Sequence, residues 1–197
     1  EFKILKYEVR GFSNLILDHI NSGKTCKDCS LFGKGAVILD TNLQNPGPVH
    51  LSIQGLNPGN EELASGIPFV GGAGRALRRY LEPLINKFNL SYVIYNTILC
   101  HTSNEKSIPD FKKVGKCCFP IVNTISQYFP SIIKIVLGEK ARTIVGATGG
   151  QITKVNGQLI KDYFVMIHPS SLQYSDTNRI LFEEATQRLE RLILRTF

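Results

Sequence analysis

The chain has 197 residues, 43% of them hydrophobic, which is enough for one globular domain with a sizeable core and short for two, so we expect residues 1–197 to form a single domain. It carries 23 Lys and Arg residues against 16 Asp and Glu residues, a net charge of +7 that suits a polyanionic partner but does not by itself demonstrate one. No run of about 18 apolar residues occurs and the first residues are charged, so we expect neither a membrane span nor a secretory signal, and an intracellular location.

Along the chain, apolar runs alternate with segments of helical periodicity. In order, the predicted elements are an irregular loop over 33–48, a strand over 49–55, a helix over 73–88, a strand over 91–97, a helix over 109–129, a strand over 131–138, a helix over 139–147, a strand over 163–167 and an amphipathic helix over roughly 179–195. Pro109 suits the first turn of its helix, whereas Pro120 predicts a kink or break within it. The alternation predicts an α/β fold with a mainly parallel sheet.

Five cysteines, an odd number, argue against a disulfide framework and for metal ligation or free buried thiols. Cys26 and Cys29 form a CxxC, and Cys100 and Cys117 form a wider pair, so four thiols are available for a tetrahedral zinc or a four-iron cluster. A zinc ribbon needs two tight CxxC pairs, and the spread of the second pair therefore favours the cluster. The alternative is that Cys100 and Cys117 are small buried hydrophobes, and either Cys117 or Cys118 is left over.

The motif GLNPG at 55–59 follows the first predicted strand, at the edge where open α/β sheets bind ligands. Its glycines allow the backbone to approach a ligand closely. The amide of Asn57, at the tip of the motif, is able to position a water or to hydrogen-bond a base edge. The alternative is that NPG forms an ordinary turn.

The motif HPSSL follows the last predicted strand. A single histidine such as His168 is more often structural than catalytic, but here it stands in a loop stiffened by proline. Ser170 and Ser171 are suited to a phosphate contact, and Leu172 is suited to an apolar wedge.

A third loop, SGIPFVGGAGRAL at 65–77, leads into a predicted helix. Phe69 in this loop is able to stack on a base, and the helix N-terminus is able to receive a phosphate. The alternative is that Phe69 belongs to the core and the glycines only relieve crowding.

Taken together, the motifs resemble one known family. The segments CKDC, GLNPGNEE, GIPFVGGAG, LGEKA and HPSSL, with Asn96 ahead of Cys100 and then Cys117, stand in the order and spacing of family 4 uracil-DNA glycosylases, the iron–sulfur branch of that superfamily. The resemblance covers about residues 26–172. It implies a three-layer α/β/α fold around a central, mainly parallel four-stranded sheet.

The resemblance also implies roles for individual residues. Cys26, Cys29, Cys100 and Cys117 would ligate a structural [4Fe-4S] cluster, with zinc as the alternative and with Cys117 preferred to Cys118 because VGKC matches the family's helix register. Phe69 would stack on the flipped base, Asn96 would read a pyrimidine's Watson–Crick edge, His168 would hydrogen-bond the O2 of the base, and Leu172 would fill the space vacated in the duplex.

The first motif departs from the family 4 pattern GEAPG, because Leu56 replaces the glutamate and Asn57 replaces the alanine. The pattern GxNPG is instead similar to the mismatch-specific and single-strand-selective branches, in which the asparagine orients the attacking water. Glu62 keeps the family's second acidic position, whereas Leu63 replaces the aspartate after it. His101 stands where an arginine is common.

The expected function is therefore a monofunctional DNA glycosylase that acts on DNA as a monomer and hydrolyses the N-glycosidic bond of a flipped uracil or modified pyrimidine. The expected catalytic residues are Asn57, His168 and Glu62, and the expected substrate-binding residues are Gly55, Leu56, Phe69, Asn96, Ser170 and Leu172. Two alternatives stay open: a glycosylase for a hypermodified base of foreign DNA, and a module that binds uracil or abasic DNA without cleavage.

Overall fold

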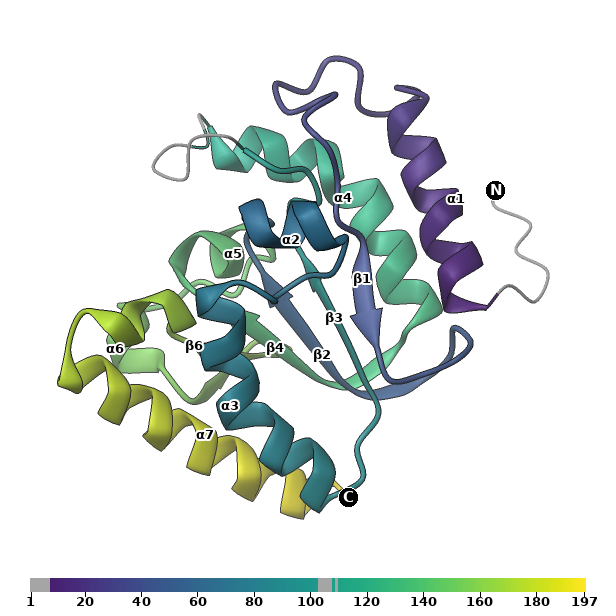
Figure 1. The fold of residues 1–197 in the computed structure, drawn as a ribbon. Helices are drawn as coiled ribbons and strands as arrows, with labels where there is room; N and C mark the ends of the chain where they lie inside the picture. The colour runs from purple at the N-terminus through teal and green to yellow at the C-terminus, as the bar shows by residue number, and fades with distance from the viewer. Residues whose placement is uncertain (1–7, 103–107, 109) are drawn as a thin grey trace.

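One sheet of six strands forms the centre of the computed structural model, which describes residues 8–102, 108 and 110–197 (Figure 1). The strand order is β1-β3-β2-β4-β6-β5. The four inner strands pair in parallel, and they are β2 (Val49–Gly55), β3 (Tyr92–Asn96), β4 (Ser131–Leu137) and β6 (Tyr163–Met166). These are the four strands that the apolar runs predict, so the α/β fold with a mainly parallel sheet is confirmed.

Two further strands lie at the edges of the sheet, so the prediction of four strands was wrong. β1 (Leu39–Thr41) pairs antiparallel with β3, and β5 (Gln158–Ile160) pairs antiparallel with β6. Each has only three residues, too few to show the alternation of polar and apolar residues by which a strand is recognised. β1 falls within 33–48, the segment expected to be a loop.

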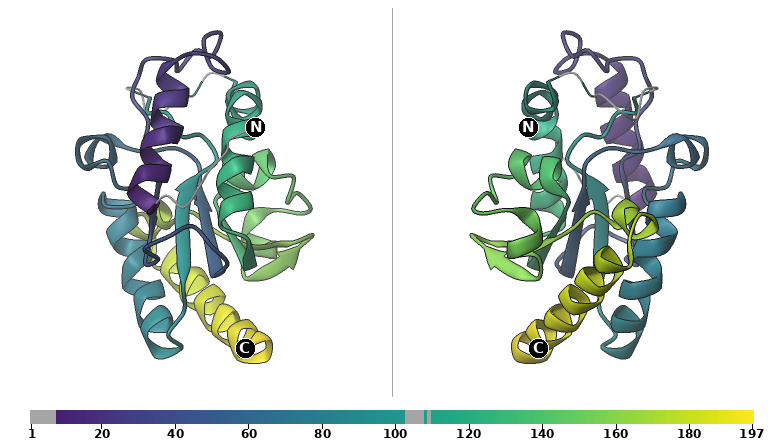
Figure 2. Two further views of the ribbon diagram at one scale, coloured as in Figure 1. Left: turned by 90° about the vertical axis from the view of Figure 1, so that its right-hand side faces the viewer. Right: turned by 90° about the vertical axis from the view of Figure 1, so that its left-hand side faces the viewer.

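Helices cover both faces of the sheet. They are α1 (Val9–Asn21), α2 (Asn60–Ser65), α3 (Gly72–Lys87), α4 (Phe111–Tyr128), α5 (Glu139–Ile144), α6 (Ile152–Val155) and α7 (Asp176–Thr196), with a 3₁₀ turn, η1, at Pro169–Gln173. Figure 2 shows α3 and α4 on opposite sides of the sheet, which gives the three expected layers. None of the helices that the structure describes combines the length and the apolarity needed to cross a bilayer.

Each face of the sheet has its own apolar core. On one face, Leu77 of α3 and Phe182 of α7 pack over the inner strands. On the other, Phe12 of α1 lies 5.7 Å from Phe129 at the end of α4, measured between ring centroids. The inner strands are thus covered from both sides.

Pro120 does not break α4, which runs from Phe111 to Tyr128. Its side chain is exposed, so the ring has room on the solvent side, and the hydroxyl of Thr124 donates to its carbonyl over 3.0 Å. The predicted break is therefore absent. Pro109 lies outside the described residues.

The segment after the CxxC pairs with the backbone around Cys100. Ala36 and Cys100 form an isolated antiparallel bridge, the amide of Val37 donates to the carbonyl of Leu99 over 2.9 Å, and the amide of His101 donates to that of Gly35 over 2.8 Å. These bonds bring the front of the chain to the edge of the sheet where the loops gather.

Candidate active site

The residues singled out in the sequence gather at the carboxyl ends of four neighbouring parallel strands. Gly55 ends β2 and is the Cα partner of Asn96, which ends β3. Gly138 follows β4, and its amide donates to the carbonyl of Met166 over 2.8 Å at the end of β6, two residues before His168. The sheet therefore sets Asn96, Gly55, Gly138 and His168 in a row.

Gly55, Phe69 and Asn96 meet at one end of this row. A methyl group at Gly55 would lie 2.3 Å from Cζ of Phe69 and 2.6 Å from Oδ1 of Asn96, so only glycine fits there. Asn96 is 2% exposed. Among the described residues, its Oδ1 is the buried side-chain polar atom that has no hydrogen-bond partner, which is costly unless a ligand supplies a donor.

Phe69 is buried, at 6% exposure, rather than free at the surface. Its backbone has a φ of 58°, a left-handed conformation that is unfavourable for an aromatic residue. Arg78 holds this turn, because its Nε donates to the carbonyl of Phe69 over 2.9 Å while its Nη2 donates to Asp40 over 2.8 Å. A methyl group at Gly74 would lie 2.1 Å from the carbonyl carbon of Phe69, so α3 begins directly against the strained turn.

Glu62 ties the GLNPG motif to the Phe69 loop. Its Oε2 accepts from the amide of Gly59 over 3.1 Å, and its Oε1 accepts from the amides of Val70 and Gly71 over 3.1 and 2.8 Å. The side chain is 9% exposed. Both carboxylate oxygens are thus engaged by backbone amides of two loops.

Asn57 lies half-buried at the tip of GLNPG. Its Nδ2 donates to the carbonyl of Pro58 over 3.2 Å, and Nδ1 of the buried His101 lies 3.1 Å from the same oxygen. Because a carbonyl only accepts, Nδ1 of His101 carries the proton. Leu56 is half-buried and packs against the core on the α4 side of the sheet, and its carbonyl accepts from the amide of Ile98 over 2.8 Å.

His168 is fixed in one orientation by the residues that follow it. Its Nδ1 accepts from the amide of Ser170 over 3.2 Å and lies 2.7 Å from the Ser170 hydroxyl. Since a backbone amide only donates, the neutral ring carries its proton on Nε2. Burial lowers the pKa of His168 to about 4. The side chain is therefore a neutral hydrogen-bond donor at pH 7.

Leu172 lies in η1 beneath this loop and is 8% exposed, within the apolar core that includes Phe182 and Met166. The structure therefore places Leu172 inside the protein, whereas Ser170 stays at the loop surface beside His168.

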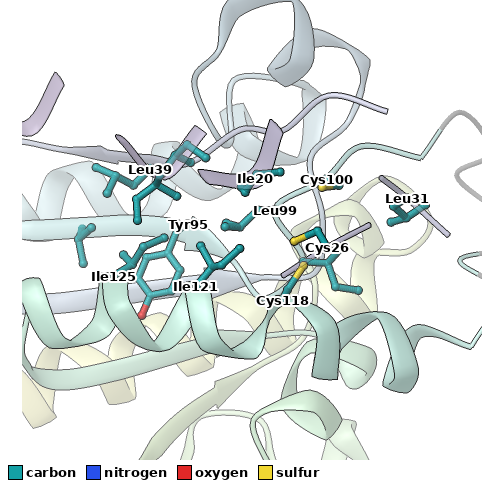
Figure 3. Close-up of a cluster of buried hydrophobic side chains, with 14 of the residues drawn as sticks. Ile20, Cys26, Leu31, Leu39, Tyr95, Leu99, Cys100, Cys118, Ile121 and Ile125 are labelled. Carbon is teal, nitrogen blue, oxygen red and sulfur yellow. The ribbon is translucent and has the colours of Figure 1, made fainter. Parts of the chain in front are cut away.

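The cysteines gather between the front of the chain and α4. Figure 3 shows Cys26, Cys100 and Cys118 among the buried apolar side chains, and Cys29 and Cys117 are half-buried. Burial raises the pKa of Cys100 to about 12, with further contributions from the thiols of Cys118, Cys26 and Cys29. Burial also raises the pKa of Cys117, as do Cys29 and Cys26. The five thiols therefore form one electrostatically coupled group.

Over residues 8–102, 108 and 110–197, no group of three or more His, Cys, Asp or Glu side chains is arranged so that it could hold a metal ion. The donor type nevertheless suits a thiolate-bound centre, since neighbouring thiols raise the pKa of Cys100, Cys117 and Cys118, and their thiolates would be stabilised by a positively charged partner.

A sequence model of the family described as the uracil DNA glycosylase superfamily matches residues 43–190 of the chain. The chain belongs to this superfamily. The match includes GLNPG, the Phe69 loop, Asn96 and HPSSL, and lies after the CxxC.

Relatives of this superfamily match more of the chain. It is 26% identical over 188 residues to a type-4 uracil-DNA glycosylase of Sulfurisphaera tokodaii, covering 86% of this chain and 81% of that protein. It is 25% identical over 194 residues to a type-4 uracil-DNA glycosylase of Saccharolobus solfataricus, covering 91% of this chain and 86% of that protein. The resemblance to the uracil-DNA glycosylases is thereby confirmed.

Sequence reasoning missed two residues that shape the site of this superfamily member, Arg78 and Asp40. Arg78 stands beside other arginines in α3, where a solvent-exposed position would be ordinary, but its side chain is only 24% exposed and pairs with Asp40 over 2.8 Å. Asp40 belongs to the short edge strand β1, which the sequence did not reveal, so no local signal pointed to this pair.

Proposed function

We propose that this chain is a monofunctional uracil-DNA glycosylase, which flips uracil out of DNA and hydrolyses its N-glycosidic bond, leaving an abasic site. The observation that carries the proposal is the unpartnered Oδ1 of Asn96, buried against Gly55 and the ring of Phe69. A buried acceptor without a partner favours a ligand that brings an N–H group. Uracil presents such a group at N3, where cytosine has an acceptor.

The ends of the parallel strands leave room for the base between the residues proposed to recognise it and the histidine proposed to act on it. β2 and β6 are separated by β4, so their ends lie about 9–10 Å apart at the usual strand spacing. Gly138, at the end of β4, brings no side chain into the interval. We assign to Phe69 the stacking surface for the base and to His168 the contact at its opposite edge, with Gly55 and Leu56 lining the approach.

Bond cleavage leaves an oxocarbenium-like sugar and an anionic base, so catalysis depends on stabilising that charge. The Nε2–H of the neutral His168 would donate to O2 of the base, where negative charge develops, and the backbone amides near residues 55–57 would assist. The imidazole of His168 is already neutral at pH 7 because its pKa is about 4, so it need not lose a proton before the base binds.

Asn57 would position the attacking water through its side-chain amide. Glu62 supports this step indirectly, because its two oxygens accept three backbone hydrogen bonds that hold the loops of Asn57 and Phe69. We therefore propose that Glu62 positions the two loops and that Asn57 positions the attacking water.

A [4Fe-4S] cluster is the metal centre that we propose, held by Cys26, Cys29, Cys100 and Cys117, with zinc as the alternative. The cluster would supply structural cross-linking and no redox step. Cys117 lies in α4, and the other three thiols lie outside helices and strands. Cys100 immediately precedes His101, whose ring contacts the carbonyl of Pro58.

DNA is the proposed partner. The net charge of +7 and the exposed side chains of Lys112, Lys113 and Lys116 on α4 suit a phosphate backbone. Ser170 would contact a phosphate beside the flipped base. We propose that the protein acts as a monomer inside the cell.

The test is single-turnover release of uracil from a defined oligonucleotide. Asn57→Ala and His168→Ala should each lower the rate by about 10²-fold or more while the fold, monitored by circular dichroism, stays intact. Unchanged rates in both variants would refute the mechanism.

A panel of oligonucleotides separates the proposed activity from its alternatives. Wild-type protein should form abasic sites in uracil-containing DNA. Release of hypoxanthine, xanthine or a bulky 5-substituted pyrimidine without release of uracil would point to a modified-base glycosylase. Tight binding of uracil or abasic DNA without any release would identify a non-catalytic module, in keeping with Leu56 at the position of the family's glutamate.

A further inference from the structure

A basic groove lies between the second half of α7 and the edge of the sheet at β5. Its lining includes three arginines and three apolar residues, which are Arg188, Arg191, Arg195, Leu159, Phe164 and Leu192. The four residues from α7 are spaced i, i+3, i+4 and i+7, so they share one face of the helix. Leu159 is the Cα partner of Phe164, so both side chains point to the same face of the sheet, the one that α7 covers.

The positive charge on the helix side of this groove is largely uncompensated. Nη1 of Arg188 donates to the carbonyl of Asn156 over 2.9 Å, and its Nη2 lies 3.9 Å from a carboxylate oxygen of Glu184. Arg191 and Arg195 are exposed, and neither forms an ion pair or a side-chain hydrogen bond within the part of the chain that the structure describes. Two of the three guanidinium groups are therefore available to bind an anion.

The sheet side of the groove is apolar. Leu159 is 54% exposed, although it stands directly beside the buried Phe164. β5 is the last strand in the order of the sheet, so no further described strand covers this leucine. An exposed apolar side chain at an open sheet edge is stabilised when a partner covers it. The groove thus has one cationic wall and one apolar wall.

The groove lies away from the candidate active site. α7 begins close to the loop after His168, because Nδ2 of Asn178 donates to the carbonyl of Ser171 over 3.0 Å. It ends at Phe197, whose ring centroid lies 4.8 Å from that of His50, the second residue of β2. The second half of α7 therefore lies toward the amino ends of the parallel strands, whereas the candidate active site lies at their carboxyl ends.

We propose that this groove binds an extended acidic segment of a partner protein, in which carboxylates alternate with apolar residues. In an extended chain, successive side chains point to opposite faces, and residues two apart are about 7 Å apart. Residues four apart on a helix have Cβ atoms about 6 Å apart. Two carboxylates of the segment then face Arg191 and Arg195, while the apolar residue between them covers Leu159.

The chemistry of the groove favours this occupant over the phosphate backbone of DNA. A guanidinium group binds a carboxylate or a phosphate through two parallel hydrogen bonds, so charge alone does not separate the two. A phosphate backbone has no apolar group to place on Leu159, whereas an acidic segment with leucines does. DNA bound at the carboxyl ends of the strands is also remote from this wall of α7.

The test measures the fluorescence anisotropy of a fluorescein-labelled peptide of alternating Asp and Leu. Wild-type protein should bind this peptide, and Arg191→Glu should weaken the binding about 10-fold or more, because one charge-assisted contact is lost and a repulsion is added. Arg10→Glu makes the same change of charge at an exposed position of α1 and should bind within about 2-fold of wild type. Leu159→Ser should weaken binding about 3-fold or more.

Absence of binding by the wild-type protein would overturn the inference, as would equal losses in Arg191→Glu and Arg10→Glu, since net charge alone would then account for the binding. Equal affinity for a peptide of alternating Asp and Ser would also overturn it, because the apolar wall would have no part. Displacement of the Asp-Leu peptide by unmodified duplex DNA, together with weaker duplex binding in Arg191→Glu, would assign the groove to DNA instead.

Discussion

At the scale of single residues, the imidazole of His168 shows how burial selects a protonation state. The amide of Ser170 fixes the tautomer, and burial lowers the pKa to about 4, so the ring donates from Nε2 as a neutral group. A cationic histidine would stabilise a base anion more strongly, but its burial would carry a desolvation cost. The structure favours the neutral donor.

This state predicts an unusual pH dependence. The rate of uracil release that depends on His168 should stay level from pH 8 to about pH 5, because the ring keeps one protonation state over this range, and should change only as the pH approaches 4. The free energy of unfolding should also fall with pH. Between pH 6.5 and 4, His168 binds a proton in the unfolded chain but not in the folded chain. The stability that the neutral, buried His168 contributes above pH 6.5 is therefore lost as the pH falls toward 4. Single-turnover rates across this range provide the measurement, and a midpoint near pH 6.5 would contradict the assignment.

At the scale of elements, the strained turn at Phe69 is held by two polar side chains from different helices. Arg78 of α3 binds its carbonyl, and Glu62 of α2 accepts the amides of the next two residues. Neither helix alone fixes the turn. The position of the proposed stacking surface therefore depends on α2 and α3 together.

Glu62→Gln tests this arrangement, because the amide has only one acceptor oxygen where the carboxylate has two. The free energy of unfolding should fall by about 1–3 kcal/mol, and KM for uracil-containing DNA should rise, because Phe69 and Asn57 lose their common anchor. Glu61→Gln on the same helix is the matched control. Glu61 forms an exposed ion pair with Arg75, so the free energy of unfolding, measured with denaturant, should change by about 0.5 kcal/mol or less. Equal effects in both variants would argue against a positioning role for Glu62.

The sequence predicted the elements that have a local signal. The inner strands are continuous apolar runs because both of their faces are buried, and the loops GLNPG and HPSSL follow them directly. The edge strand β1 and the pair formed by Arg78 and Asp40 lack such a signal, since the first is too short for periodicity and the second joins residues far apart in the chain. The sequence drew attention to Asn96 and His168, which the structure places at the ends of neighbouring strands, and it left open whether Phe69 is buried, whereas the burial of Leu172 was not expected.

At the scale of the whole molecule, the cysteines connect the front of the chain, the loop after β3 and α4. Two thiols of α4, those of Cys117 and Cys118, are candidates for the fourth ligand of the proposed cluster. Cys118 is 3% exposed within the apolar core, whereas Cys117 is half-buried. Burial raises the pKa of both thiols, and Cys29 and Cys26 raise it further in both, so the difference in exposure decides between them. We assign the ligand to Cys117 and the packing role to Cys118.

Serine substitutions distinguish these roles. Cys117→Ser should lose iron, inorganic sulfide and visible absorbance, whereas Cys118→Ser should retain them, with at most a loss of stability from placing a hydroxyl in an apolar site. Elemental analysis of the purified proteins gives the measurement. The reverse pattern would make Cys118 the ligand, and stoichiometric zinc in colourless wild-type protein would replace the cluster by a zinc site.

The backbone bridge between Ala36 and Cys100 bears on how such a centre is assembled. Closing the long segment between the CxxC and Cys100 costs chain entropy, and in this fold hydrogen bonds between residues 35–37 and 99–101 offset part of that cost. The proposed ligand Cys100 therefore lies on backbone that is paired with the segment following Cys26 and Cys29. The cluster and these hydrogen bonds would then fix the same crossing of the chain, so the binding free energy of the cluster would add to a closure that backbone pairing also supports.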